Sequence, residues 1–256
     1  MDKFLSCDWG TTSFRLRLIE KVSAGILAEE QSDKGIAETF AAWKQEGASA
    51  ETRISFYLFI IDEHIKLIEK RLGVSLDNIP VVISGMASAG IGLIELPYKM
   101  LPVKADGSDI KTHTIESPKG FAHAITIISG VRTENDVIRG EETQLIGALH
   151  TDLPAGENIF IFPGTHSKHI VVENSSIIRF TTYMTGEFFD LLSKKSILSL
   201  SVMRGGSIED IQNKQSFEQG VKDGSVSNLL HHSFLVRTND LFQKYNKGKS
   251  LYRSRG

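Results

Sequence analysis

The chain has 256 residues, of which 41% are hydrophobic and 23% are charged. This length allows one large domain or two smaller ones, each with its own core, and the composition is typical of a soluble globular protein. The formal net charge of -2 argues against an extended basic surface, so we expect no nucleic-acid partner.

The sequence gives no sign of a membrane or export segment. The longest apolar stretch, residues 54–61, contains Ser55 and is closed by Asp62, and it is too short to cross a bilayer. The first residues are charged and lead into only a few apolar ones, unlike a signal peptide. The single cysteine, Cys7, excludes an internal disulfide and a cysteine cluster for a metal. We therefore expect a cytoplasmic protein without a membrane partner.

Three antiparallel strands are predicted at the start of the chain, over residues 3–8, 14–21 and 25–32. The first ends in Asp8, which is followed by Trp9, Gly10, Thr11, Thr12 and Ser13. A carboxylate beside a Gly/Thr/Ser turn offers an acid to Mg²⁺ and N–H and hydroxyl groups to phosphate. The pattern favours phosphoryl transfer, although a plain polar hairpin turn has the same composition.

A long amphipathic helix is predicted next, over residues 51–72, because its apolar residues recur at helical spacing and Gly73 follows as a stop signal. Residues 79–84 read as a buried strand that opens into a glycine-rich loop over 85–92. On the residues alone, this loop is flexible and Met86 fills the core.

The second half repeats the order of the first. Residues 141–150 are predicted to form a linking helix, followed by strands over 157–162, 166–173 and 176–182 and by helices over 185–195 and 226–245. No sequence repeat accompanies this order. A P-loop is absent, because Gly248, Lys249 and Ser250 lack the opening glycine, which is Gln243 here. Any use of ATP must therefore depend on the hairpins.

Three segments together resemble the signature segments of the 2-dehydro-3-deoxygalactonokinase family. They are DWGTTS at 8–13, GEETQLIGA at 140–148 and FPGTHSK at 162–168, with further likeness at 84–88, 96–98 and 184–187. The resemblance covers residues 4 to about 245. It implies the α/β fold of the sugar kinase and actin-like ATPase superfamily, with two ribonuclease-H-like βββαβαβα halves around a cleft and an incomplete second half. The implied domains are 1–135, with the acceptor-binding loop, and 136–256.

The resemblance implies ATP-dependent phosphorylation of 2-dehydro-3-deoxy-D-galactonate on its terminal 6-hydroxyl, with ATP and Mg²⁺ as cofactors. It makes Asp8 the Mg²⁺ ligand, through water, since Mg²⁺ keeps much of its hydration. The implied phosphate contacts lie in two hairpin turns, one of Gly10, Thr11 and Thr12 and one of Gly164, Thr165 and His166. Lys168 either adds positive charge at the γ-phosphate or points to solvent.

Phosphoryl transfer to a hydroxyl also needs a carboxylate that accepts the proton. The resemblance ranks Glu141 first for this role, Asp136 second and Glu142 third, while an acid at a helix start can also be a simple capping charge. A sugar acid calls for a guanidinium and small donors in its pocket. The implied acceptor contacts are Arg15, Ser84, Gly85, Met86, Ser88 and Arg139.

The end of the chain departs from the family, whose members continue well beyond the position of Lys247. We expect the adenosine site to be missing or incomplete and the last helix to expose apolar side chains, namely Leu229, Leu230, Leu235 and Phe242. The alternative function is a non-catalytic sugar-acid or nucleotide sensor, or a degenerate member of the superfamily. The acceptor epimer and the oligomeric state, including a homodimer, stay open.

Overall fold

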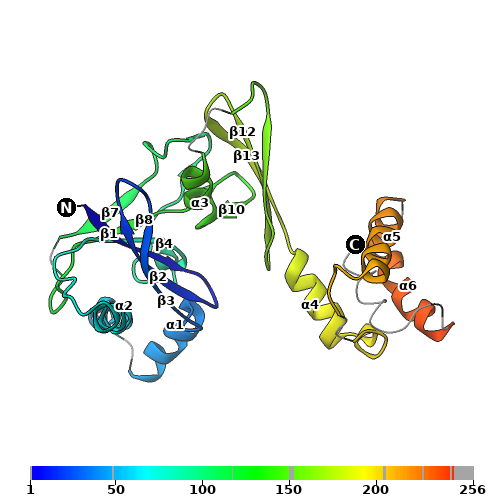
Figure 1. Cartoon of the computed structure of the whole chain (residues 1–256), viewed down its shortest axis with the longest axis horizontal. Coiled ribbons are helices and arrows are strands. Elements are labelled where there is room, and N and C mark those ends of the chain that lie inside the picture. Colours follow the sequence, from blue (N-terminus) through cyan, green and yellow to red (C-terminus); the bar gives the residue numbers. More distant parts are fainter. Residues whose placement is uncertain are drawn as a thin grey trace. The chain divides into compact units, whose positions relative to one another are not determined.

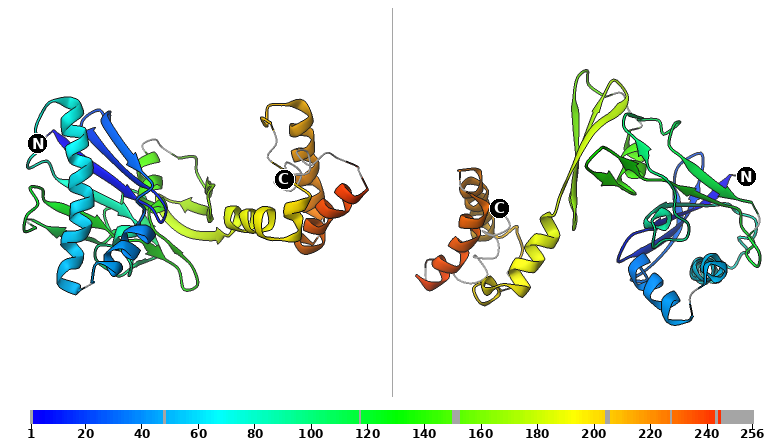
Figure 2. Two further views of the ribbon diagram at one scale, coloured as in Figure 1. Left: turned by 90° about the horizontal axis from the view of Figure 1, so that it is seen from below. Right: turned by 180° about the vertical axis from the view of Figure 1, so that it is seen from behind.

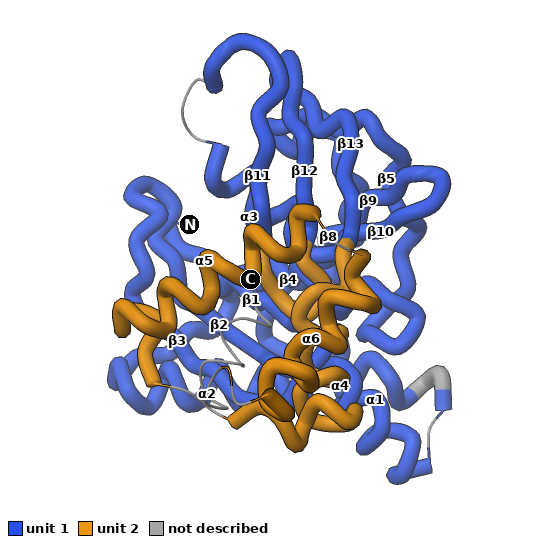
Figure 3. The backbone as a smooth tube through the Cα atoms, turned by 90° about the vertical axis from the view of Figure 1, so that its right-hand side faces the viewer, with its two compact units in different colours: residues 1–162, 168–182 blue, residues 163–167, 183–256 orange. Residues whose placement is uncertain are grey.

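The computed structural model describes residues 2–47, 49–116, 118–149, 153–203, 206–226, 228–242 and 244. The chain divides into two compact units (Figure 3). Unit 1 comprises Met1–Phe162 and Lys168–Thr182, and unit 2 comprises Pro163–Ser167 and Tyr183–Gly256. Because these units are defined by compactness alone, the domain border expected at residue 135 stays a prediction.

The strands expected at the start of the chain are confirmed. They are β1 (Lys3–Trp9), β2 (Phe14–Glu20) and β3 (Ile26–Ser32), paired antiparallel in that order. In β1 the buried residues Leu5, Cys7 and Trp9 alternate with partly exposed ones. This period of two is what one buried sheet face requires.

The predicted strand after the long helix is also confirmed, as β4 (Val81–Gly85), and it pairs parallel to β1. On its other side lie β8 (Ile125–Ile128), parallel to β4, and β7 (Thr112–Ile115), antiparallel to β8. The full sheet has the order β3-β2-β1-β4-β8-β7. Because β1 and β4 are parallel, their last residues meet at one edge, with Asp8 opposite Ser84 and Trp9 opposite Gly85.

Two helices, α1 (Ile36–Gln45) and α2 (Ala50–Leu72), pack beside this sheet (Figures 1 and 2). The predicted helix over 51–72 is thus confirmed. Ser49 caps its start, where the Ser49 and Thr52 side chains form a capping box, and Gly73 ends it with a φ of 69°. Its buried side chains, Tyr57, Ile61, Ile65 and Ile68 among them, join the sheet residues in the main hydrophobic core.

A second, smaller core in unit 1 is built from short strands and one helix. The elements that form or border it are β5 (Lys99–Met100), β6 (Val103–Lys104), β9 (Val131–Arg132), β10 (Val137–Ile138), α3 (Glu141–Ala148), β11 (Asn158–Phe162), β12 (Ser167–Glu173) and β13 (Ser176–Tyr183). The short helix η1 (Met86–Ser88) belongs to the main core, in which Ala87 is buried. The strand orders are β10-β9-β5 and β11-β12-β13-β6. The three later strands and the linking helix were expected, whereas the two-residue strands were not.

One difference from the expected βββαβαβα pattern lies between β4 and β8. In the described residues of this connection, 86–116 and 118–124, the structure has η1 and short strands and no α-helix. One strand of this connection, β6, instead joins the sheet β11-β12-β13-β6, where it pairs antiparallel with β13. The fold is therefore mixed α/β with several sheets.

Unit 2 is helical. It contains α4 (Thr185–Lys195), η2 (Ile197–Leu200), α5 (Ile211–Val226) and α6 (Leu229–Leu241). Helix α4 matches its predicted range, while α6 is shorter than the predicted 226–245, whose end lies outside the described residues, as does the tail at 245–256. Leu229, Leu230 and Phe242 are 62%, 75% and 68% exposed, as expected, and Leu235 is partly buried. Within the described ranges, no helix is long and apolar enough to span a bilayer.

Candidate functional site

Asp8 lies at the end of β1 as a partly exposed carboxylate. Across the hairpin its register partner is Arg15, whose Nη1 lies 3.8 Å from Asp8 Oδ2. The Arg15 guanidinium also lies 4.0 Å from Glu29, so it is shared between two acids. Asp8 therefore keeps an open side while a cation holds it in place.

The turn after Asp8 is anchored through its carbonyl groups. Gly10 N–H donates to Ser13 O at 2.9 Å, and the carbonyls of Gly10 and Thr11 accept from the first N–H groups of α1, at 3.0 and 3.1 Å. The side chains of Thr11 and Thr12 are exposed. In the described part of the chain, no group accepts a hydrogen bond from the backbone N–H of Thr11 or Thr12. These N–H groups are available to an anion.

At Gly85, the backbone at the end of β4 lies in close contact with the backbone of β1. This glycine has φ 87° and ψ -148°, and a Cβ there would lie 2.6 Å from the carbonyl oxygen of Trp9. Gly140 has φ 111°, a conformation that favours glycine, and a Cβ there would be in ordinary contact with Gly85 Cα, at 3.4 Å. The two glycines thus bring the start of α3, with Glu141, to the ends of β1 and β4.

We expect Gly85→Ala to destabilise the protein by about 3 kcal/mol or more, because the new methyl group would clash with fixed backbone in a strained conformation. Chemical denaturation measures this loss. Gly47→Ala is the matched control, since Gly47 has φ 85° and open space around its Cβ position. Equal losses in the two variants would contradict the close contact at Gly85.

Glu141 at the start of α3 forms an ion pair with Lys168. Lys168 Nζ lies 3.0 Å from Glu141 Oε1, and Arg139 N–H donates to Glu141 Oε2 at 3.2 Å. The Lys168 side chain is only 8% exposed, so the alternative in which it points to solvent is wrong. The residue proposed as first choice for the base is therefore held by one cation and one backbone N–H.

Glu142 points into the protein and is 1% exposed. Both of its carboxylate oxygens accept from Gly140 N–H, at 2.9 and 2.8 Å, and one also accepts from Thr143 Oγ1 at 3.2 Å. Burial raises the pKa of this carboxyl to about 7 from 4.5, although the bonds from Gly140 oppose the shift. Its burial leaves Glu142 poorly placed to meet a substrate.

The raised pKa of Glu142 predicts how stability depends on pH. The folded protein keeps the carboxyl proton to about pH 7, while the unfolded chain loses it near 4.5. The protonated Glu142 carboxyl therefore contributes about 3 kcal/mol to the free energy of unfolding below pH 4.5. This contribution is lost as the pH rises through 7. Glu142→Gln should remove this pH-dependent loss between pH 5 and pH 8 in denaturation experiments. Glu134 is exposed, so Glu134→Gln should keep the same pH dependence of stability as the parent. If Glu142→Gln also keeps it, the raised pKa of Glu142 is contradicted.

Asp136, the second choice for the base, is engaged by backbone groups. Its Oδ1 accepts from Val137 N–H at 2.8 Å and its Oδ2 accepts from Thr182 N–H at 2.7 Å. Thr182 belongs to β13, so this carboxylate links the β10 hairpin to the neighbouring sheet. These bonds favour a structural role for Asp136.

Arg139 directly precedes Gly140, and its guanidinium has two partners. Its guanidinium lies 4.3 Å from the ring centroid of Tyr98, and its Nη1 donates to Ser88 Oγ at 3.0 Å. Ser88 is fully buried, while Met86 packs against the main core. Tyr98 lies in one of the quoted segments but was not predicted as a site residue. Its stacking fixes the plane of the Arg139 guanidinium.

The second glycine turn, Gly164 to His166, belongs to unit 2 and rests on the start of α4. Thr165 O accepts from Glu187 N–H at 3.0 Å, and His166 Nε2 bonds to the Glu187 carboxylate. Gly164, Thr165 and His166 are exposed. Because Gly10 and Gly164 belong to different units, their expected meeting across one cleft stays a prediction.

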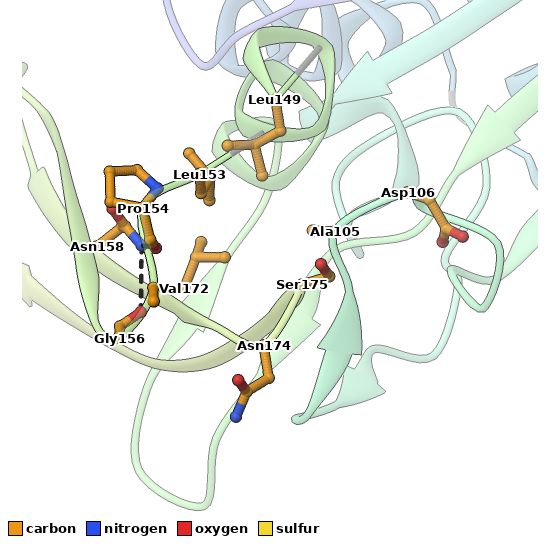
Figure 4. A pocket seen from close by; sticks show the side chains of 11 residues that line it. Ala105, Asp106, Leu149, Leu153, Pro154, Gly156, Asn158, Val172, Asn174 and Ser175 are labelled. Carbon is orange, nitrogen blue, oxygen red and sulfur yellow. Dashed lines mark hydrogen bonds between the residues drawn. The ribbon is translucent and has the colours of Figure 1, made fainter. Parts of the chain in front are cut away.

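Two hollows accompany these elements, one in each unit. The hollow in unit 2 has a volume of about 840 Å³, with Gly164 at its border and mainly apolar side chains of α4, η2 and α6 in its lining. The hollow in unit 1 has a volume of about 510 Å³ and is lined by Leu149, Leu153 and Val172 with a polar rim (Figure 4). Among the described residues that line it, Asp106 is the only ionisable one, and none of the predicted site residues is among them.

No group of three or more His, Cys, Asp or Glu side chains within the described ranges could hold a metal. A metal at Asp8 would therefore take one protein carboxylate and fill its other positions with water or substrate oxygens. This donor set suits Mg²⁺, which binds through one or two carboxylates and retains water.

Comparison with known proteins gives a consistent result. The probable 2-dehydro-3-deoxygalactonokinase DgoK1 of Rhizobium meliloti is 34% identical over 203 residues, which are 78% of this chain and 59% of that protein. The 2-dehydro-3-deoxygalactonokinase of Escherichia coli is 30% identical over 253 residues, covering 92% of this chain and 70% of the relative. The chain thus spans about three fifths to seven tenths of the length of these curated relatives.

A solved structure agrees with these relatives. A crystal structure of a protein assigned as a 2-dehydro-3-deoxygalactonokinase, from Sinorhizobium meliloti, superimposes with a TM-score of 0.76 at 26% identity, covering 98% of this chain and 77% of the other. The family model described as DGOK, 2-keto-3-deoxy-galactonokinase, matches residues 8–255. The chain therefore belongs to the 2-keto-3-deoxy-galactonokinase family.

Proposed function

We propose that this protein transfers the γ-phosphoryl group of ATP to the terminal 6-hydroxyl of 2-dehydro-3-deoxy-D-galactonate. The family and the names of its relatives support the reaction. The proposal is supported by the backbone at Gly140, between Arg139 and Glu141, which lies against Gly85. Gly85 ends β4, whose residue Ser84 is opposite Asp8 of the parallel strand β1. One carboxylate for a metal, one for a proton and one guanidinium for an acid are what such a transfer requires.

In this proposal Glu141 accepts the proton of the attacking hydroxyl. The ammonium of Lys168, 3.0 Å away, holds the Glu141 carboxylate in place and would put positive charge near the transferred group. Asp136 is the less favoured alternative, since both of its oxygens already accept backbone hydrogen bonds.

The two glycine turns belong to different units. In unit 1, no described group accepts from the N–H groups of Thr11 and Thr12, so these groups suit phosphate oxygens. In unit 2, the turn at Gly164 borders a hollow of about 840 Å³, large enough for a nucleotide. Asp8 would hold Mg²⁺ through one carboxylate and water. When bound, Mg²⁺ neutralises negative charge on the phosphate oxygens.

Arg139 would bind the carboxylate of the acceptor. Its stacking on Tyr98 and its bond to Ser88 leave other guanidinium N–H groups for a bidentate contact. Arg15 is less suited, because Asp8 and Glu29 already share its charge. Ser84 and Gly85, at the same edge of the sheet, would border the rest of the acceptor.

The proposal includes the two-domain architecture of 1–135 and 136–256, built from two ribonuclease-H-like halves. Its support is that three antiparallel strands open the first half and that β11, β12 and β13, followed by α4, give the second half a similar order.

The test is a coupled ADP-release assay with ATP, Mg²⁺ and either 2-dehydro-3-deoxy-D-galactonate or its gluconate-derived epimer. We expect the galactonate-derived acid to stimulate ADP release and to be preferred over the epimer by kcat/KM. If neither acid stimulates release while calorimetry still detects binding of the acid, the kinase proposal fails and the non-catalytic alternative takes its place.

A further inference from the structure

The turn of Arg139, Gly140 and Glu141 carries two of the groups used in the proposed reaction. Its backbone is held at the Gly140 amide by Glu142, at Arg139 N–H by Glu141 and at the Gly140 carbonyl by Gln144 N–H. Gly140 has φ 111°. Glycine adopts positive and negative φ about equally well, so this residue does not by itself fix the conformation of the turn. Arg139 leaves the turn toward Ser88 and Tyr98, while Glu141 leaves it toward Lys168. A small rotation at Gly140 would therefore move both side chains at once.

Glu142 is the residue that holds the Gly140 amide. Both of its carboxylate oxygens accept from Gly140 N–H, and its side chain is buried. No lysine, arginine or histidine in the described ranges forms an ion pair with it. A buried carboxylate without a cation is costly to the fold, as the pH dependence derived above also implies. Because the ionised Glu142 side chain lowers the stability of the fold, we expect this residue to have a role in the proposed reaction.

We propose that Glu142 is a positioning residue that fixes the turn at Gly140, so that Glu141 and Arg139 meet the reacting hydroxyl and the acceptor carboxylate together. This inference rests on the proposed phosphoryl transfer and deepens it. Glu142 itself touches no substrate. A positional error of about 1 Å in such a constellation can cost about a hundredfold in rate.

The test compares Glu142→Leu with Glu142→Gln. Leucine has nearly the same size but accepts no hydrogen bond, whereas glutamine keeps one oxygen for Gly140 N–H. We expect Glu142→Leu to be at least as stable as the parent at pH 8, because a buried charge is removed, and yet to lose at least tenfold in kcat at a nearly unchanged KM for ATP. Glu142→Gln should recover most of the loss.

A purely structural role predicts a different result, in which activity follows the folded fraction in both variants. If Glu142→Leu is folded and keeps more than half of the parental kcat, the inference is overturned. If the parent protein itself transfers no phosphoryl group, the proposed function has failed, and hydrogen exchange at the Gly140 amide then decides the inference. Faster exchange in Glu142→Leu but not in Glu142→Gln supports the holding role, and unchanged exchange in both refutes it.

Discussion

Glu141→Gln should lower kcat by about 10³-fold, while the KM of the sugar acid changes by less than about threefold. Glutamine keeps the size of the side chain and can still accept from Arg139 N–H, as Glu141 Oε2 does at 3.2 Å. It cannot take a proton from the attacking hydroxyl. The loss should therefore be confined to the transition state, and steady-state ADP release at saturating ATP measures it.

The matched control for this change is Glu134→Gln, because Glu134 is exposed and lies outside the site. It should keep the parental kcat. If Glu141→Gln retains most of its turnover, Glu141 is not the base, and the same assay on Asp136→Asn then tests the second choice.

Arg139→Lys should raise the KM of the sugar acid by about 10- to 100-fold, with kcat changed only a few-fold. Lysine keeps the charge but loses the planar fork and the stacking on Tyr98 at 4.3 Å. A charged hydrogen bond of this kind contributes about 1.5–3 kcal/mol, which sets the size of the effect. Initial rates over a range of acceptor concentrations measure it.

Two controls test whether the effect of Arg139→Lys is due to the contact with the acceptor carboxylate. Arg132→Lys, at an exposed position of β9, should leave the KM unchanged. The carboxamide analogue of the acceptor, which lacks the negative charge, should bind the parent and Arg139→Lys about equally. A KM for the acid that is the same in Arg139→Lys and the parent would place the carboxylate elsewhere.

Local patterns were sufficient to predict the elements that carry Asp8 and Glu141. Alternation of apolar residues predicts β1 and β2, helical spacing with Gly73 predicts α2, and Gly140 before an amphipathic segment predicts α3. These features depend on residues within one or two turns of chain. For that reason they can be found without knowledge of the fold.

The contacts of the site depend on distant segments and were harder to predict. The stacking of Arg139 on Tyr98 follows from the pairing of two-residue strands, which are too short to show periodicity. The burial of Lys168 did have a signal, because in β12 it lies two residues before Ile170 and four before Val172 and so shares their strand face, which is in the core. Helix α5 was missed because its sequence is polar and contains Gly220 and Gly224, which weaken a helical pattern.

The proposed reaction moves a phosphoryl group from ATP to the end of a sugar acid, and phosphorus NMR detects that product itself. In a mixture of the protein with ATP, Mg²⁺ and 2-dehydro-3-deoxy-D-galactonate, we expect a new phosphomonoester signal, split into a triplet by the two protons of the terminal carbon. Its amount should equal that of the ADP formed. Release of ADP together with inorganic phosphate alone, or no reaction at all, would contradict the proposed reaction.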